Sequence, residues 1–296
     1  MPERKWDVPK RYLRLHLYQD TKEKKTLSFL TEDVHVKFDT TAACTGALTE
    51  ANITIGGIKV AKMFGLATSS TLWIKDWLQH RIVITAGYTN PDRYATIFDG
   101  TVMDASANLD TADYSVTIKA TTGFEKLPQP KGYCFPGNVP VATIAKAFAD
   151  DNDWAFVDAL QDPTVTINNY ATREHSVVEQ LREITMWAPV DLYVDKGRLY
   201  LKRRGSRGEG LPTLKIYSND IIGTPRPTQT GCKIKVRMNP WARSGQQVEV
   251  HSLKYPDLNS IKFYLDVLSH AGDTYGSDWF TELNLTKDGM GYYKNE

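Results

Sequence analysis

The residues best suited to chemistry lie near the end of the chain, in a short segment that contains His270, Asp273 and Asp278. A histidine and two carboxylates can act as an acid–base pair or as metal ligands, provided that three such groups converge on one point. Here the aspartates stand in the stretch AGDTYGSDW, whose residue types favour turns. We therefore interpret the segment as a turn between two strands. The sequence predicts no catalytic, cofactor-binding or metal-binding residues.

Two further charged clusters have similar interpretations. Residues 150–153 (DDND) resemble part of a calcium-binding loop but lack its central glycine and distal glutamate, so we expect a solvated helix end. Residues 202–204 (KRR) form the longest basic cluster, which we interpret as a solvated strand end. Three histidines fall on the polar sides of expected strands, as surface or interface residues do: His16, His35 and His251.

Composition excludes several classes of protein. The formal net charge of +1 argues against strong non-specific binding to nucleic acid or to an anionic membrane. The chain has no dinucleotide-binding, phosphate-loop, nucleophile-elbow or HExxH motif. Its three cysteines are far apart and form no zinc or disulfide pattern: Cys44, Cys134 and Cys232. No long apolar segment occurs, so we expect no membrane insertion and folding in a cytoplasm.

Alternating apolar residues predict the strands that must position these groups. In the first 130 residues the period of two recurs in six segments joined by short polar turns, which indicates a compact antiparallel barrel or sandwich. The pair Gly56-Gly57 predicts a bulge or a break, and residues 61–80 favour a helical turn and loop. The six segments are 12–18, 32–39, 51–60, 81–88, 95–106 and 113–122.

The middle of the chain changes in composition. Residues 127–140, rich in proline and glycine, predict a linker or entry loop, with Pro140 as the first residue of a helix. Ser176 and Glu179 form a capping box for a second helix, which Pro189 ends. Residues 191–201 predict a hairpin with Gly197 in the left-handed conformation.

In the last quarter of the chain, apolar and polar residues again alternate with a period of two. Residues 232–285 predict a small domain of four antiparallel strands. The expected fold is mainly β (α+β), with two antiparallel β-barrel or sandwich domains flanking a small α/β domain. The expected boundaries are 1–130, 131–208 and 209–296.

Three segments in this order resemble bacteriophage baseplate hub proteins of the contractile-tail and Mu-like type. The segments ANITIGGI, RIVITAGY and FDGTVMDAS resemble the first tube-like domain of that family. The segment SVVEQLREITMWAPVDLYVDKGRLYLKRR resembles its small middle domain. The most specific part, from IIGTPRPTQTGCKIKVRMNP through GQQVEVHS to VLSHAGDTYGSDWFTELNL, is similar to the second tube-like domain. The resemblance covers residues 10–290.

The resemblance implies a structural protein of the virion tail baseplate, assembled in the host cytoplasm. It implies a homotrimer whose six tube-like domains form a ring between the six-fold tail tube, or a tube-initiator protein, and the three-fold central spike. The middle domain would lie outside the ring. The channel would hold the end of the tape measure protein and pass DNA in transit, and baseplate wedge proteins are further implied partners. The chain ends soon after the third segment, so we expect no fused lysozyme or peptidase domain.

Two other functions are compatible with the sequence. A tail-associated cell-wall hydrolase would need a convergent acid pair or metal site, for which Asp273 and Asp278 are the candidates. A glycan-binding tail module would use the seven tryptophans and fifteen tyrosines, although these are dispersed along the sequence. The sequence favours a structural ring protein that is not an enzyme and needs no cofactor.

Overall fold

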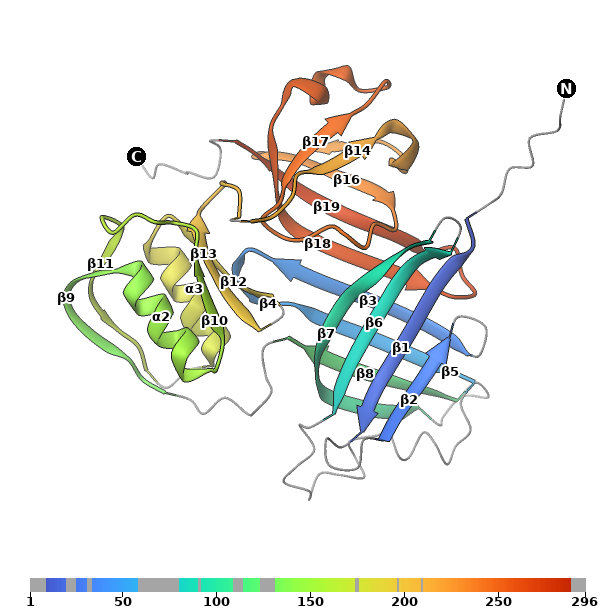
Figure 1. The fold of residues 1–296 in the computed structure, drawn as a ribbon, viewed down its shortest axis with the longest axis horizontal. Helices are drawn as coiled ribbons and strands as arrows, with labels where there is room; N and C mark the ends of the chain where they lie inside the picture. The colour runs from blue at the N-terminus through green and yellow to red at the C-terminus, as the bar shows by residue number, and fades with distance from the viewer. Residues whose placement is uncertain are drawn as a thin grey trace, which may run out of the picture.

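The computed structural model describes residues 9–19, 25–30, 34–57, 80–89, 92–108, 114–122, 131–173, 176–195, 197–208 and 210–288. Most of these residues lie in β-strands, most strand pairs are antiparallel, and the described part of the chain contains two α-helices. The prediction of a mainly β fold is therefore confirmed. Figure 1 shows a large body of β-sheet and, beside it, a smaller body that carries both helices.

The first part of the chain folds into two sheet layers, which we name the first β-unit. One layer contains β1, β2 and β6, the other contains β3, β5 and β8, and β7 belongs to both. The seventeen residues of β7 pair with β6 up to Thr101 and with β8 from Thr101 onward. Gly100 stands at this bend, where an added Cβ atom would lie 2.5 Å from the carbonyl oxygen of Thr121. The strands are β1 (Arg11–Gln19), β2 (Lys25–Leu30), β3 (His35–Ala43), β5 (Glu50–Gly56), β6 (Arg81–Thr89), β7 (Asp92–Asn108) and β8 (Ser115–Thr121).

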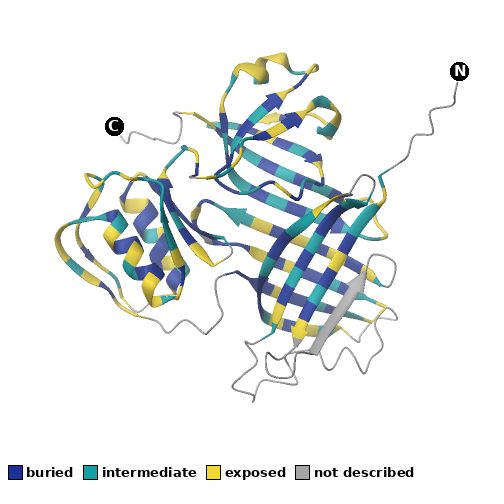
Figure 2. Cartoon of the chain, viewed as in Figure 1, coloured by how far each residue is buried: buried dark blue, intermediate teal, exposed yellow. Residues whose placement is uncertain are grey.

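The alternation in sequence appears as alternation in burial, visible as stripes across the strands in Figure 2. Because successive side chains of a strand point to opposite faces, every second residue enters the space between the two layers. That space holds one continuous core. Its members include Leu13, Leu15, Val36, Phe38, Ile53, Ile55, Ile82, Ile84, Val116 and Ile118.

The last part of the chain, residues 210–288, forms the second β-unit around a separate core. The four predicted strands are present, and two short strands are added to them. One of these, β14, pairs in parallel with β17, and the other, β15, pairs with β16. The strands are β14 (Leu214–Tyr217), β15 (Arg226–Pro227), β16 (Gly231–Arg237), β17 (Gln247–His251), β18 (Phe263–Asp273) and β19 (Trp279–Lys287).

The two β-units share one sheet, which the sequence did not lead us to expect. Strand β18 pairs with β3 through seven residue pairs, from Val267↔Ala43 to Asp273↔Lys37. We name this pairing the seam. It joins thirteen strands into a single hydrogen-bonded sheet. The prediction of a self-contained four-stranded domain is corrected accordingly, because β18 satisfies its outer edge with a strand from the other end of the chain.

In the sequence, the middle unit, residues 131–208, separates the two β-units. Its sheet has the order β10-β13-β12-β4, so that β4 (Thr45–Leu48), which directly follows β3, extends it as a parallel neighbour of β12. Helices α2 (Val141–Asp151) and α3 (Val177–Trp187) pack on this sheet around a third core. The other strands are β9 (Cys134–Pro140), β10 (Ala155–Asp158), β11 (Thr166–Ala171), β12 (Val190–Asp195) and β13 (Arg198–Arg203).

Several local predictions for the middle unit are confirmed. Ser176 and Glu179 form the expected capping box, α3 ends at Trp187, and Gly197 has a φ of 70° in the β12–β13 hairpin. Two predictions are corrected. Pro140 precedes α2 at the cap position, and residues 134–140 form strand β9, paired with β11, in place of a loop.

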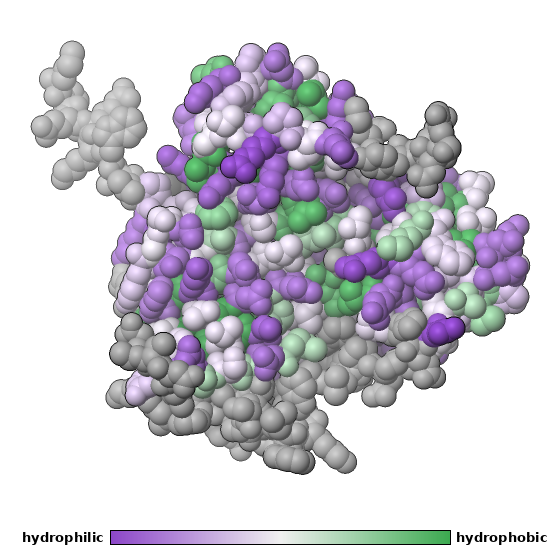
Figure 3. All heavy atoms as spheres, turned by 180° about the vertical axis from the view of Figure 1, so that it is seen from behind, coloured by the Kyte–Doolittle hydropathy of each residue, from purple (hydrophilic) through white to green (hydrophobic). Residues whose placement is uncertain are grey.

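Some predictions fall on residues outside the described ranges. These are most of the helical turn and loop at 61–80, the tip of the first hairpin, the turn before β8 and the start of the 127–140 linker. In the opposite view of the molecule, hydrophilic residues cover much of the surface and apolar residues are scattered among them (Figure 3).

Candidate functional site

One face of the shared sheet carries polar side chains across both β-units. The cross-strand register places the buried residues of β3 and β18 on the same side, so that Phe38 lies opposite Gly272 and Thr40 opposite His270. The other side, which we name the open face, is exposed or half-buried. It is formed by Lys37, Asp39, Thr41, Asn52, Thr54, Thr117, Lys119, Lys233, Lys235, Ser269, Ala271, Glu282 and Asn284.

Charges on the open face are mixed. Lys233 Nζ lies 2.7 Å from Glu282 Oε1, and Lys235 stands opposite Glu282 in the β16–β19 register. The Lys235 ammonium also lies 3.4 Å from the centre of the Phe280 ring. At the other end of the sheet, Lys119 is registered opposite Asp104. Because cations and carboxylates alternate at neighbouring cross-strand positions, the open face has no large area of a single sign.

The other layers meet the sheet in two different places. The β1–β6 layer covers the core side in the first β-unit. The middle unit stands at one end of the sheet, where Tyr193 donates a hydrogen bond to the carbonyl oxygen of Ser244 at 3.3 Å and where residues of α3 and β13 face Tyr264 and Thr286 across a cavity. A small cavity of about 20 Å³ between the units is lined by residues that include Tyr193, Arg243 and Leu268. The packing therefore leaves the open face as the shared surface of the two β-units.

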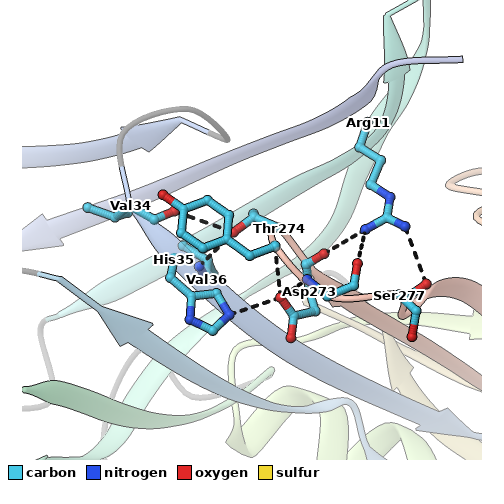
Figure 4. A network of polar contacts seen from close by, with 9 residues as sticks. Arg11, Val34, His35, Val36, Asp273, Thr274 and Ser277 are labelled. Carbon is cyan, nitrogen blue, oxygen red and sulfur yellow. Dashed lines mark hydrogen bonds and ion pairs between the residues drawn. The ribbon is translucent and has the colours of Figure 1, made fainter. Parts of the chain in front are cut away.

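The predicted turn at residues 273–278 is a loop held by several hydrogen bonds at one end of the seam. We name it the rim loop (Figure 4). The Asp273 carboxylate accepts hydrogen bonds from the amides of Tyr275 at 2.9 Å and Gly276 at 2.7 Å. It also lies 2.9 Å from Nε2 of His35 on β3. Partial burial opposes ionisation of Asp273, but these contacts outweigh burial and hold its pKa below the usual value. The Tyr275 ring stacks on the His35 ring at 5.0 Å.

Strand β1 fixes the rim loop from the other side. The Arg11 guanidinium donates hydrogen bonds to the carbonyl oxygens of Asp273 at 2.9 Å, Gly276 at 2.6 Å and Ser277 at 3.3 Å (Figure 4). It also lies 5.6 Å from the centre of the Trp279 ring. These bonds hold a loop of the second β-unit against the first strand of the chain.

Below the loop, Trp279 closes the end of the first core. Its ring meets Phe38 edge-on at 5.8 Å, and its Nε1 donates to the carbonyl oxygen of Gly87 at 3.2 Å. An aromatic side chain of the second β-unit thus belongs to the core of the first. No local pattern in the sequence predicts these long-range contacts, because the partners are more than 190 residues apart.

The three candidate chemical residues do not converge. His270 is buried on the core side, with Nδ1 2.9 Å from Oγ1 of Thr281. Asp273 instead contacts His35 at the rim, and Asp278 is exposed and accepts the Asp273 amide through its carbonyl oxygen. In the described ranges no group of three histidine, cysteine, aspartate or glutamate residues could hold a metal ion. The interpretation as a turn agrees with this geometry.

The other charged clusters differ partly from expectation. At the end of α2, Asp151 accepts hydrogen bonds from Tyr133 and Lys131, both at 2.7 Å, so this helix end is not simply solvated. The basic cluster at 202–204 is not a solvated strand end either. Lys202 is 2% exposed and pairs with Asp191, which is equally buried. Arg204 donates to carbonyl groups at the end of α3 and the start of β12. His35 and His251 are exposed, as predicted.

Comparisons with known proteins identify a family whose sequence profile matches this chain. A sequence profile of the family described as baseplate hub gp41 matches residues 16–274. No curated protein sequence matches the chain. In the described part of the chain, no helix is both long and apolar enough to cross a membrane.

Solved structures share the fold at low sequence identity. The 43 kDa tail protein of prophage MuSo2 from Shewanella oneidensis has a TM-score of 0.60 at 10% identity, covering 96% of this chain and 98% of its own. A tail protein from Neisseria meningitidis MC58 has a TM-score of 0.60 at 11% identity, with 95% and 97% covered. The E. coli c3393 protein, a component of the type VI secretion system, has a TM-score of 0.57 at 8% identity, with 88% and 75% covered.

Proposed function

The chain belongs to the baseplate hub gp41 family of phage tail structural proteins, and from that premise we propose that it forms a homotrimeric ring joining the six-fold tail tube to the three-fold spike. The shared sheet is the observation that carries this proposal. Each chain presents two β-units side by side in one sheet, so three chains would present six such units in a closed ring. Such a ring matches a six-fold partner on one side and a three-fold partner on the other.

The open face is our proposed lining of the channel. It is the surface that the two β-units share; the β1–β6 layer lies on its opposite side, and the middle unit stands at one end of the sheet. A basic lining would hold passing DNA by its phosphates, whereas neighbouring cations and carboxylates on this face weaken such retention. The polar face therefore suits a conduit through which DNA moves without stable binding.

The remaining expectations follow from the same arrangement. We propose domains at 1–130, 131–208 and 209–296, with the middle domain outside the ring and the protein located in the tail baseplate of the virion. We further propose contacts with the tail tube or its initiator, the central spike, the tape measure protein and baseplate wedge proteins. A structural neighbour, the E. coli c3393 protein, is itself described as similar to tail proteins gp27 and gp5 of phage T4. No enzymatic step is assigned, because the candidate acid–base residues lie apart.

The test combines the mass of the assembly with the accessibility of a cysteine placed on the open face. Mass photometry of the purified chain is expected to give three times the 33.4 kDa of one chain. In a Cys134→Ser background, Asn52→Cys on the open face should then react with a small maleimide but not with a polyethylene-glycol maleimide wider than a DNA channel. Lys146→Cys, exposed on α2, is the matched control and should react with both reagents.

Two outcomes would contradict the proposal. A chain that remains monomeric at high concentration and with spike protein present does not form the ring. If the chain is a trimer but Asn52→Cys reacts with both reagents as readily as Lys146→Cys, the trimer stands and the open face does not line the channel.

A further inference from the structure

A cavity of about 590 Å³ lies where the middle unit meets the second β-unit. Helix α3 and strands β12 and β13 form one wall, β18 and β19 form the other, and Thr45 of β4 completes it. The wall is rich in charged side chains and hydroxyl groups. Tyr264 and Thr286 continue the cross-strand rows of the open face, so the cavity adjoins one end of that face and lies away from the rim loop.

The cavity wall has an excess of positive charge. Its cations are Arg182, Lys202 and Arg204, and its carboxylates are Asp191 and Asp266. Asp191 and Lys202 form an ion pair whose side chains are each 3% exposed. Burial, and then the negative charge of Asp191, raise the pKa of Asp266, so this carboxyl group resists ionisation. Asp191 is shared between Lys202 and Arg204, whose Nε lies 3.6 Å from Oδ1, so the wall keeps an excess of positive charge.

Two buried polar atoms in the wall have no hydrogen-bond partner among the residues that the structure describes. These are Nε of Arg204 and Oδ1 of Asp191, which lie 3.6 Å apart. They face each other as an ion pair that is too long for a hydrogen bond, and a buried donor or acceptor without a hydrogen bond is costly. The exposed Arg182 guanidinium, on the same wall, takes part in none of the described ion pairs.

A ligand that suits these groups must supply both an acceptor and a donor. A carboxylate is the planar acceptor that guanidinium groups bind best, and a backbone N–H is a donor for an aspartate oxygen. A peptide segment with an acidic side chain carries both, and a free oxyanion carries the acceptor alone. We propose that the cavity is a docking site for an acidic segment of another tail protein, whose carboxylate pairs with Arg182 and Arg204.

This inference rests on the proposed function, since it takes the occupant to be a neighbouring component of the tail. Its test uses the full chain and a capped hexapeptide of alternating Glu and Gly as the probe, with binding measured by calorimetry or NMR titration. The acidic peptide should bind, and Arg182→Ala should weaken binding about tenfold. The substitution keeps the backbone and the Cβ atom of Arg182 against which Gly46 of β4 packs, so we expect the variant to fold.

The controls separate the alternatives. Arg173→Ala, which removes an exposed arginine outside the cavity, should leave binding unchanged. A Lys-Gly peptide that binds as well as the acidic one, or equal binding by Arg182→Ala, would overturn the assignment. Inorganic phosphate that displaces the peptide at equal concentration would make the site an oxyanion site and overturn the peptide docking. Mass photometry on the same samples reports the trimer independently, so failure of the ring and failure of the docking site are distinguished.

Discussion

His270 shows how a residue that invites a chemical interpretation can serve packing instead. Its ring is 2% exposed and makes one hydrogen bond, to Thr281, while Nε2 is buried without a partner among the described residues. Burial, and then the positive charge of Arg243, lower the pKa of His270 from its ordinary 6.5 to about 3. The folded chain therefore keeps this imidazole neutral at pH values where the unfolded chain protonates it.

This difference predicts a pH dependence of stability. The contribution of His270 is fully present above pH 6.5 and is lost as the pH falls from 6.5 toward 3, because only the unfolded chain binds the proton in that window. We expect a loss of about 2 kcal/mol in the free energy of unfolding at about pH 5 relative to neutral pH. Urea denaturation at the two pH values measures it.

A His270→Gln variant should lose this part of the pH dependence, whereas His251→Gln, which removes an exposed ring from β17, should retain it. An unchanged slope in His270→Gln would mean that other groups produce the acid sensitivity.

At the scale of elements, the seam places β3 and β18 so close that one position admits only hydrogen. A Cβ atom on Gly272 would lie 2.3 Å from the Phe38 ring and 2.9 Å from the Trp279 ring. Both rings are buried in the first core, so they have little room to move. The seam is therefore sensitive to a single added methyl group.

We expect Gly272→Ala to lower the free energy of unfolding by about 1–3 kcal/mol through overpacking. Ser269→Ala, on the open face of the same strand, should change it by less than about 0.5 kcal/mol. Thermal and urea denaturation of the two variants decide the matter. If both variants have equal stability, the close approach of Phe38 and Trp279 to Gly272 does not restrict the seam.

The strands themselves could be predicted from the sequence, because their period of two and their turn residues are local signals. The seam could not, because alternation determines which face of β18 is buried but not which strand pairs with its edge. The prediction that residues 202–204 form a solvated strand end was wrong for a related reason. Both faces of β12 and β13 are covered, by the helices on one side and by the second β-unit on the other. A charged residue there is buried by a neighbour that the local sequence does not reveal.

At the scale of the whole molecule, the buried pair of Asp191 and Lys202 lies where the middle unit meets the second β-unit. Burial opposes the charge on Lys202, but the neighbouring Cys44 and the Asp191 carboxylate together outweigh burial, so the pKa of Lys202 lies above its usual value. Cε of Lys202 comes within 3.5 Å of the position that a Cβ atom on Gly245 would occupy, so the pair adjoins the second β-unit. The loss of one partner would therefore leave a buried charge at the contact between the two units.

Lys202→Met should cost about 3–5 kcal/mol, because it leaves the Asp191 carboxylate buried with only the longer contact to Nε of Arg204. The double variant with Asp191→Leu should recover most of that loss, since it removes both charges. Hydrogen exchange in β12 and β13, measured beside urea denaturation, locates the effect. A single variant as stable as the double variant would show that Asp191 finds another partner or is protonated.

The pairing of β3 with β18 also has a consequence for the order of events during synthesis. Strand β3 is complete at residue 43, but its partner is complete only at residue 273. At ribosomal speed this interval is on the order of tens of seconds. For that time one edge of β3 lacks its final neighbour, so the sheet of the first β-unit stays incomplete until β18 has been made. A chain interrupted in between would keep an unsatisfied strand edge, which is prone to aggregate. Only a chain translated through β18 therefore enters assembly with that edge paired.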